Sequence, residues 1–275
     1  VMSGSRMTII AGVFSICAIL CYIVCFKLTG ERVEVPASNQ KISASAIFKS
    51  IFTNKALLGI IVAAIFVLLS QLTVMSLAGY VYPNVYGSAA AQSTASLLGT
   101  VVMLVVCAPF ASKLSAKFGK KELAMGSSIL SALVWLVCLI WRPASVWGFV
   151  ACYILANIGM GFFNTIIWAM ITDVIDDAEV RNGVREDGTI YSVYSFARKL
   201  GQAFSSGLVG ALLGIIGYTE ATAFDPAVTR GIFNMACIAP IIGFVCIVLA
   251  LAFLYPLNKK KVEENVAELA ARRNK

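Results

Sequence analysis

The chain of 275 residues is 59% hydrophobic and 13% charged, with a net charge of +8. Soluble domains average about 45–50% apolar and about 25% charged residues, so this composition argues against a water-soluble fold. The basic residues lie between apolar stretches and form no aromatic-interleaved basic face, so we expect no nucleic-acid partner. Histidine, the commonest general base and metal ligand, is absent, which disfavours an enzyme, a metal site or a resident cofactor.

Seven apolar stretches meet or approach the length that crosses a bilayer core of about 30 Å. Because an unpaired backbone amide is costly in lipid, each stretch is expected to be an α-helix and not a strand. The eight cysteines all lie in these stretches and are expected to be small buried side chains. The predicted spans are residues 8–28, 57–79, 91–111, 123–141, 146–171, 189–216 and 232–256.

A long polar interval separates the first predicted span from the other six. The spacing of its apolar residues, Ile42, Ala46, Ile47 and Ile51, predicts an amphipathic helix on the membrane surface, and Val262, Val266 and Leu269 repeat the pattern in the tail. An ordinary solvated helix beside the membrane explains both patterns as well. One span, a linker and six spans resemble the end of a six-plus-six protein.

This organisation predicts four parts of an incomplete, C-terminal portion of a longer protein. They are the last helix of an N-terminal bundle at 1–29, a central linker at 30–56, a six-helix bundle at 57–256 and a tail at 257–275. Lysine and arginine predominate in the linker, in the 113–121 loop, near 181–185 and in the tail, which places these segments and the C-terminus in the cytoplasm. The 80–87 connection is then expected to face outward.

The sixth predicted span carries charges that are costly inside a membrane and therefore indicate function. Arg198 and Lys199 lie about ten residues past its start near Thr189, which is near the middle of a bilayer at about 1.5 Å per residue. A helical projection gathers the polar residues into one sector of about 140°. They are Tyr191, Tyr194, Ser195, Arg198, Lys199, Gln202, Ser205 and Ser206. Two interpretations fit this pattern: a polar wall that lines a water-filled cavity, and a buried ion pair between helices.

The fifth predicted span presents a second polar face. Asn157, Gly161, Asn164 and Trp168 recur at spacings of four, three and four residues. Amides beside a flat aromatic ring suit the hydroxyls and C–H faces of a sugar, although interhelical hydrogen bonds are an alternative, above all for Asn157. Asn164 and Trp168 are the preferred substrate contacts, and Gln71 on the second span is ambiguous.

Charges of both signs crowd the interval between the fifth and sixth spans, at residues 173–187. The interval is expected to be a solvated loop or, alternatively, a set of ion pairs that clasp two bundles and separate when a transporter opens. Under the second interpretation, the gating residues are Asp173, Asp176, Arg181 and Arg185.

Five short motifs in this region carry a family resemblance. They are Asp173-Val-Ile-Asp176-Asp177-Ala-Glu179, Gly183-Val-Arg185-Glu186-Asp187-Gly188, Tyr191-Ser192, Lys199-x-Gly201 and Gly214-Ile-Ile-Gly217-Tyr218. Together they resemble the glycoside-pentoside-hexuronide:cation symporters, the melibiose-permease-like family of the major facilitator superfamily. The basic 113–121 segment also looks like the loop between the second and third helices of a facilitator half.

The resemblance implies twelve helices in two bundles, with this chain supplying helices six to twelve. It matches the substrate-facing lysine of the family to Lys199 and two sugar-contacting positions to Tyr194 and Ser195, where melibiose permease has an amide and a threonine. The tyrosine at 194 departs from that pattern. A second departure is on the fifth predicted span, where melibiose permease has a sugar-contacting tryptophan at the position of Asn164, and Trp168 follows one turn later. The coupling cation, Na⁺ or H⁺, is implied to bind in the N-terminal bundle, outside these residues.

The expected function is a plasma-membrane sugar:cation symporter for a glycoside, pentoside or hexuronide, and the Arg198–Lys199 pair suits an acidic sugar. Its expected partners are the sugar, membrane lipid and the N-terminal bundle. An uncoupled facilitator or a lipid transporter of the same superfamily is a second possibility. A seven-helix receptor with Lys199 as a Schiff base is a third, weakened by the lack of a carboxylate counter-ion in the predicted spans.

Overall fold

The computed structural model describes residues 4–30 and 54–273, which fall into two compact units divided between Ser43 and Ala44. The first unit contains the helix α1, Gly4–Leu28, an apolar segment of membrane-spanning length. A single helix cannot bury its own side chains, so the apolar residues of α1 are exposed in this unit. The amphipathic helix predicted within residues 30–54 falls almost wholly outside the described residues.

The second unit is built from helices, and no strand occurs in the described part of the chain. Long helices alternate with short connections: α3 (Lys55–Tyr80), η1 (Val81–Val85), α4 (Ala89–Val102), η2 (Met103–Cys107), α5 (Ala108–Phe118), α6 (Lys120–Trp141), α7 (Val146–Asn182), α8 (Asp187–Ile215), α9 (Pro226–Phe253) and α10 (Lys259–Arg273). The π-helical turn η1 extends α3, and η2 joins α4 to α5 as one span.

Six of the described helical segments are long and apolar enough to cross a membrane. They include α1 and five segments of the second unit, and each overlaps a span predicted from the sequence. The remaining predicted span is α8, which is a helix of 29 residues but is made less apolar by its polar side chains. The prediction of an all-α polytopic membrane protein is confirmed.

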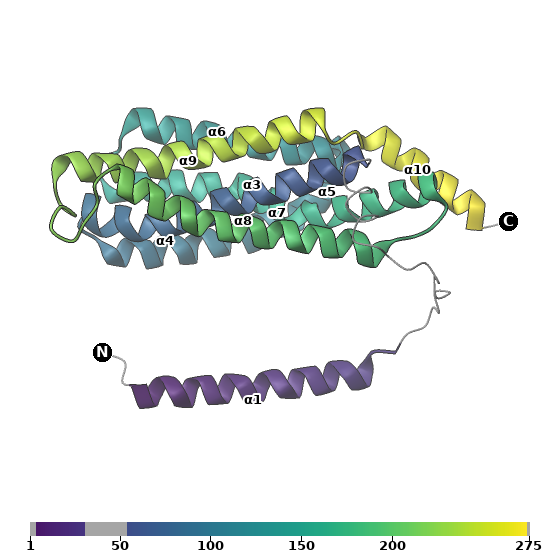
Figure 1. Cartoon of the computed structure of the whole chain (residues 1–275), viewed down its shortest axis with the longest axis horizontal. Coiled ribbons are helices and arrows are strands. Elements are labelled where there is room, and N and C mark those ends of the chain that lie inside the picture. The colour runs from purple at the N-terminus through teal and green to yellow at the C-terminus, as the bar shows by residue number, and fades with distance from the viewer. Residues whose placement is uncertain (1–3, 31–53, 274–275) are drawn as a thin grey trace. The chain divides into compact units, whose positions relative to one another are not determined.

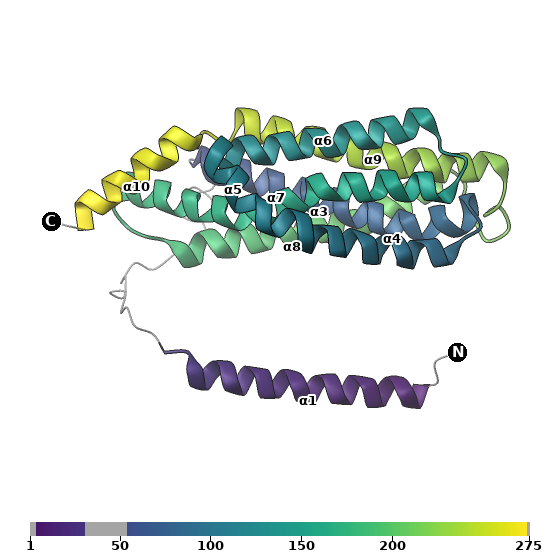
Figure 2. The ribbon, with the colours of Figure 1, turned by 180° about the vertical axis from the view of Figure 1, so that it is seen from behind.

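The helices of the second unit lie roughly side by side along its long axis (Figure 1). Helices α6 and α9 run along one side and α4 and α8 along the other, with α3 and α7 between them, as the reverse view also shows (Figure 2). Helix α3 packs against both α8 and α9, and α7 packs against both α4 and α6. On the α4–α8 side, residues of α3, α4, α7 and α8 therefore lie near one another. The candidate site described below is on this side.

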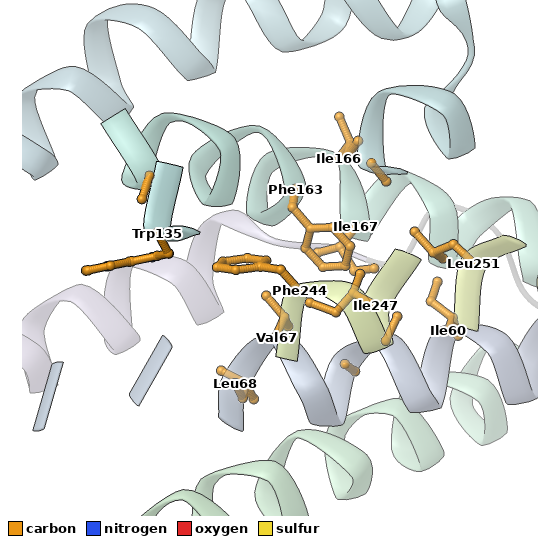
Figure 3. Packing of buried hydrophobic residues seen from close by; sticks show 14 of the residues in the cluster. Ile60, Val67, Leu68, Trp135, Phe163, Ile166, Ile167, Phe244, Ile247 and Leu251 are labelled. Carbon is orange, nitrogen blue, oxygen red and sulfur yellow. The ribbon is translucent and has the colours of Figure 1, made fainter. Parts of the chain in front are cut away.

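The core lies where α3, α6, α7 and α9 meet. Large buried side chains from the four helices interdigitate there, including Trp135 of α6, Phe163 of α7 and Phe244 of α9 (Figure 3). Close approach requires glycine where α8 meets α3, because a Cβ on Gly201 would lie 2.8 Å from the carbonyl oxygen of Ile65. The glycine of the Lys199-x-Gly201 motif thus lets α8 pack closely against α3, two residues after Lys199.

Helix α7 is longer than the sequence predicted, since it continues from Val146 to Asn182 and ends at Gly183, whose φ is 73°. At about 1.5 Å per residue, its 37 residues span about 55 Å, well beyond a bilayer core of about 30 Å. The expected acidic loop is therefore mostly helix: Asp173, Asp176 and Arg181 lie on the last turns of α7. The solvated-loop interpretation was therefore wrong, whereas ion pairs, as in the alternative interpretation, occur at this end of α7.

Helix α10 packs against the end of α7. Of the three apolar residues expected on one face, Leu269 is buried and Val262 partly buried, whereas Val266 is 52% exposed. The neighbouring Asn265 takes the inward position and is only 2% exposed. A polar contact within the bundle, described below, accounts for this departure from the apolar pattern.

Candidate substrate site

An aromatic and cationic cluster joins α7 to α8. The rings of Trp168 and Tyr194 meet edge to face with centroids 5.5 Å apart. The Arg198 guanidinium lies 5.6 Å from the Trp168 centroid and 5.8 Å from that of Tyr194, and it donates a 3.3 Å hydrogen bond to the Tyr194 hydroxyl. These cation–π contacts hold Arg198 in place and leave part of Trp168 exposed, at 48%.

Lys199 follows Arg198 but points to a different environment. Its side chain is exposed, and its amine donates one hydrogen bond, of 3.3 Å, to Oε1 of Gln202. No carboxylate pairs with it among the described residues. An ammonium group has three donors, so at least two remain for a ligand.

The eight polar residues that the sequence placed in one sector of α8 divide between two environments. Tyr194 and Ser205 are buried on the face that packs against α3, together with Val193, Ala197 and Gly201. The exposed members are Tyr191, Ser195, Lys199 and Ser206, with Arg198 and Gln202 partly buried at the boundary. The exposed polar face of α8 is therefore narrower than the predicted sector, because α3 covers one edge of it.

A separate cavity of about 230 Å³ lies between α3, α4, η2 and α7. Its polar lining includes Gln71, Asn157 and Asn164, and Nδ2 of Asn164 donates a 3.4 Å hydrogen bond to Oε1 of Gln71. Asn157 also donates to the Tyr153 carbonyl oxygen at 2.7 Å, an intrahelical contact. Asn164 therefore belongs to this cavity, whereas Trp168, one turn later, belongs to the α7–α8 cluster.

Ion pairs gather at the far end of α7. The Lys120 ammonium of α6 contacts the Asp173 carboxylate at 2.6 Å, and Asp173 is only 5% exposed. Arg185, in the α7–α8 connection, contacts Asp176, Glu179 and Asp187 at 2.8 Å each. Burial alone would lower the pKa of Arg185, but the hydrogen bonds to Glu179 and Asp176 and the charge of Asp187 raise it overall, so this cation is permanent.

A buried polar contact attaches α10 to the same end of α7. Nδ2 of Asn265 donates a 3.1 Å hydrogen bond to Oδ1 of Asp177, whose other oxygen lies 2.9 Å from the Arg181 guanidinium. Arg272 of α10 also donates a 3.0 Å hydrogen bond to the carbonyl oxygen of Val180. All these contacts lie within the second unit, so the predicted clasp between two bundles stays a prediction.

Sequence reasoning missed Lys120 and Asn265, which lie 53 and 88 residues from their carboxylate partners. The signal for the first was Asp173, since a buried carboxylate requires a partner and the basic 113–121 segment offers cations. Nothing in the pattern around Asn265 distinguished it from Val266.

Replacing Asn265 tests the attachment of α10. We expect Asn265→Leu to remove a hydrogen bond to a buried carboxylate, at a cost of about 2 kcal/mol. Amide hydrogen exchange in α10 should then become about 30-fold faster. The matched control is Val266→Asn, which changes an exposed neighbour and should leave exchange unaltered. Equal exchange in the two variants would contradict a role for Asn265 in docking.

The long apolar helices define a polytopic membrane protein. Residues 2–259 match the model of a family described as MFS/sugar transport protein. The chain belongs to this family, which confirms the resemblance seen in the α7–α8 motifs. A seven-helix receptor is not favoured by this assignment.

Curated relatives align along nearly the whole chain. The glucuronide carrier protein homolog of Escherichia coli K12 is 28% identical over 264 residues, which cover 95% of this chain and 56% of the relative. A putative sulfoquinovose importer of Salmonella typhimurium is 29% identical, and the alignment covers 96% of this chain and 56% of the relative. The isoprimeverose transporter of Lactiplantibacillus pentosus is 24% identical, and the alignment covers 93% of this chain and 55% of the relative. The chain thus spans about half the length of the curated relatives it matches.

Proposed function

We propose that this chain forms the C-terminal portion of a secondary active transporter that carries a glycoside, pentoside or hexuronide with Na⁺ or H⁺. The observation that carries the proposal is the exposed Lys199 ammonium beside the ordered Trp168–Tyr194–Arg198 cluster. Family membership and the names of the relatives support the transport of a sugar. Ser195, Tyr191, Gln202 and Asn164 are proposed as further substrate contacts.

An acidic sugar is the favoured substrate. Arg198 and Lys199 put two positive charges on neighbouring residues near the middle of α8, and neither has a carboxylate partner among the described residues. A ligand carboxylate or sulfonate would supply the countercharge, since charges in membrane segments are normally paired. Two of the relatives are named for acidic sugars, a glucuronide and sulfoquinovose, whereas isoprimeverose is neutral.

Transport is proposed to occur by rocking of two bundles around a site at mid-membrane. The coupling cation would bind in the N-terminal bundle, outside this chain, as the family resemblance implies. Asp173, Asp176, Arg181 and Arg185 are proposed to belong to the gate at the cytoplasmic end, where their partners would change as the bundles rock. The proposed location is the plasma membrane, with the linker and the C-terminus in the cytoplasm, because basic residues gather there.

Uptake by the complete gene product in membrane vesicles tests this function. Hexuronides and neutral glycosides should be compared under an imposed Na⁺ gradient, an imposed H⁺ gradient and no gradient. We expect one gradient to drive accumulation of a hexuronide above its equilibrium level. Equilibration without accumulation in every condition would indicate an uncoupled facilitator instead, and no uptake of any sugar would contradict the proposed substrate class.

A further inference from the structure

A second polar hollow lies away from the candidate substrate site, where the end of α7 meets the start of α10. It has a volume of about 310 Å³. We call it the basic pocket, and its polar side chains are Arg181, Asn258, Lys260, Lys261 and Glu264. Pro256 and Leu257, from the connection between α9 and α10, complete its wall. The hollow is far larger than a single water requires, so it can admit a polyatomic ligand.

The cations of the basic pocket are incompletely neutralised. Arg181 reaches Asp177 at 2.9 Å with one of its nitrogens, which leaves other guanidinium donors. Lys261 lies 3.7 Å from Glu264, and both side chains are about half exposed, so this pair is loose. The Lys260 side chain has neither a hydrogen bond nor an ion pair to any residue that the structure describes. Even with Glu264 and Asp177 counted, positive charge prevails.

The position of these lysines on α10 strengthens the case for an anion. Lys259, Lys260 and Lys261 open the helix, and its first turn contains no acidic residue. Helix N-termini carry partial positive charge, so lysines there repel the helix dipole and an anion relieves the repulsion. The Lys259 amine turns away to the Ala116 carbonyl oxygen at 2.8 Å, which leaves the other two lysines for the pocket.

The height of the basic pocket along the bundle indicates the source of the anion. The apolar helix α9 ends at Phe253, six residues before α10 begins at Lys259. The pocket therefore lies just past the end of the apolar α9 span, where phospholipid headgroups are expected to begin. Basic pockets at this level bind anionic headgroups in other membrane proteins.

We propose that the basic pocket binds a phosphate group, supplied by an anionic phospholipid headgroup, between Arg181, Lys260 and Lys261. The two lysines donate to the phosphate oxygens, and the Arg181 donors not used by Asp177 complete the site. Bound lipid would tie the start of α10 to the end of α7, in addition to the Asn265–Asp177 contact. This binding is independent of which solute the protein carries.

The test measures stabilisation of the purified, complete gene product by added lipid. Its thermal unfolding midpoint is followed in detergent as phosphatidylglycerol, phosphatidylcholine or inorganic phosphate is titrated at constant ionic strength, which gives an apparent affinity for each. We expect phosphatidylglycerol alone to stabilise the wild type. The Lys260→Gln/Lys261→Gln variant should need about 25-fold more of this lipid, since each lysine near a headgroup contributes about fivefold.

The matched control is Lys113→Gln/Lys117→Gln, which removes two exposed lysines of α5 outside the pocket and should leave the affinity unchanged. If inorganic phosphate stabilised the wild type but not the pocket variant, the site would be supported, but its ligand would be free phosphate and not a lipid headgroup. Equal phosphatidylglycerol affinity in the wild type and the pocket variant, or an equal loss in both double variants, would overturn the proposal. Lys260→Glu provides a second variant and should weaken binding by charge repulsion.

Discussion

Uptake of an acidic sugar should fall about 100-fold in kcat/KM when Lys199 is replaced by alanine. The lysine is expected to donate to the ligand carboxylate near the middle of α8. Removing one partner of such a charge pair costs about 3 kcal/mol, which corresponds to about two orders of magnitude. The measurement is the initial rate of hexuronide uptake into vesicles at several concentrations, normalised to the amount of protein in the membrane.

Three comparisons distinguish a direct contact from a structural effect of Lys199→Ala. Lys199→Arg keeps the charge and should retain more uptake than the alanine variant. A neutral glycoside should lose less uptake than a hexuronide, because it lacks the countercharge. Arg230→Gln removes an exposed cation at the start of α9 and should leave uptake near the wild-type level. Equal losses for acidic and neutral sugars would contradict a salt bridge to the substrate.

The Lys120–Asp173 pair should give the largest stability effect in the bundle. Lys120→Met leaves the Asp173 carboxylate, 5% exposed, without its cation at 2.6 Å. Stranding one member of a buried pair costs about 3–5 kcal/mol, which corresponds to a drop of about 10 °C in the unfolding midpoint of a bundle of this size. The midpoint is measured on the purified protein in detergent.

The double variant Lys120→Met/Asp173→Leu separates loss of the pair from loss of packing. Replacing both charges by apolar side chains removes the stranded carboxylate and should restore most of the stability. Lys117→Met is the matched control, because Lys117 is exposed and has no ion pair in the described part of the chain. A double variant no more stable than Lys120→Met would contradict the account of a stranded charge.

The helices were predictable because the apolar stretches needed only length and composition to be recognised. Their ends were harder: α7 extends eleven residues beyond its predicted end at 171, since Lys120, Arg185 and Asn265 satisfy the carboxylates of its last turns. Those partners come from three separate segments, and periodicity within one helix carries no information about them. Resemblance of the motifs identified the family where periodicity could not.

The candidate site was predictable in its residue types but not in its geometry. The sequence placed Trp168 and Asn164 on one face of α7, yet the structure gives them different partners: Trp168 meets Tyr194, and Asn164 meets Gln71. The polar sector that a helical projection gives for α8 divides in the structure between a buried and an exposed part. That Tyr194 lies buried while Lys199 stays exposed depends on the close contact between Gly201 and α3, which no single-helix projection contains.

The unbroken length of α7 makes it a lever. One rigid rod carries Asn157 and Trp168 near the candidate site and Asp176 and Glu179 near its end. From Asn157 to Glu179 the helix measures about 33 Å, so a tilt of about 10° about Asn157 would move the acidic end by about 6 Å. The 2.8 Å contacts of Arg185 do not survive such a displacement unless the arginine travels with the rod. In the proposed transport cycle, a small movement at the candidate site would thus be amplified into a change of charge partners far from it.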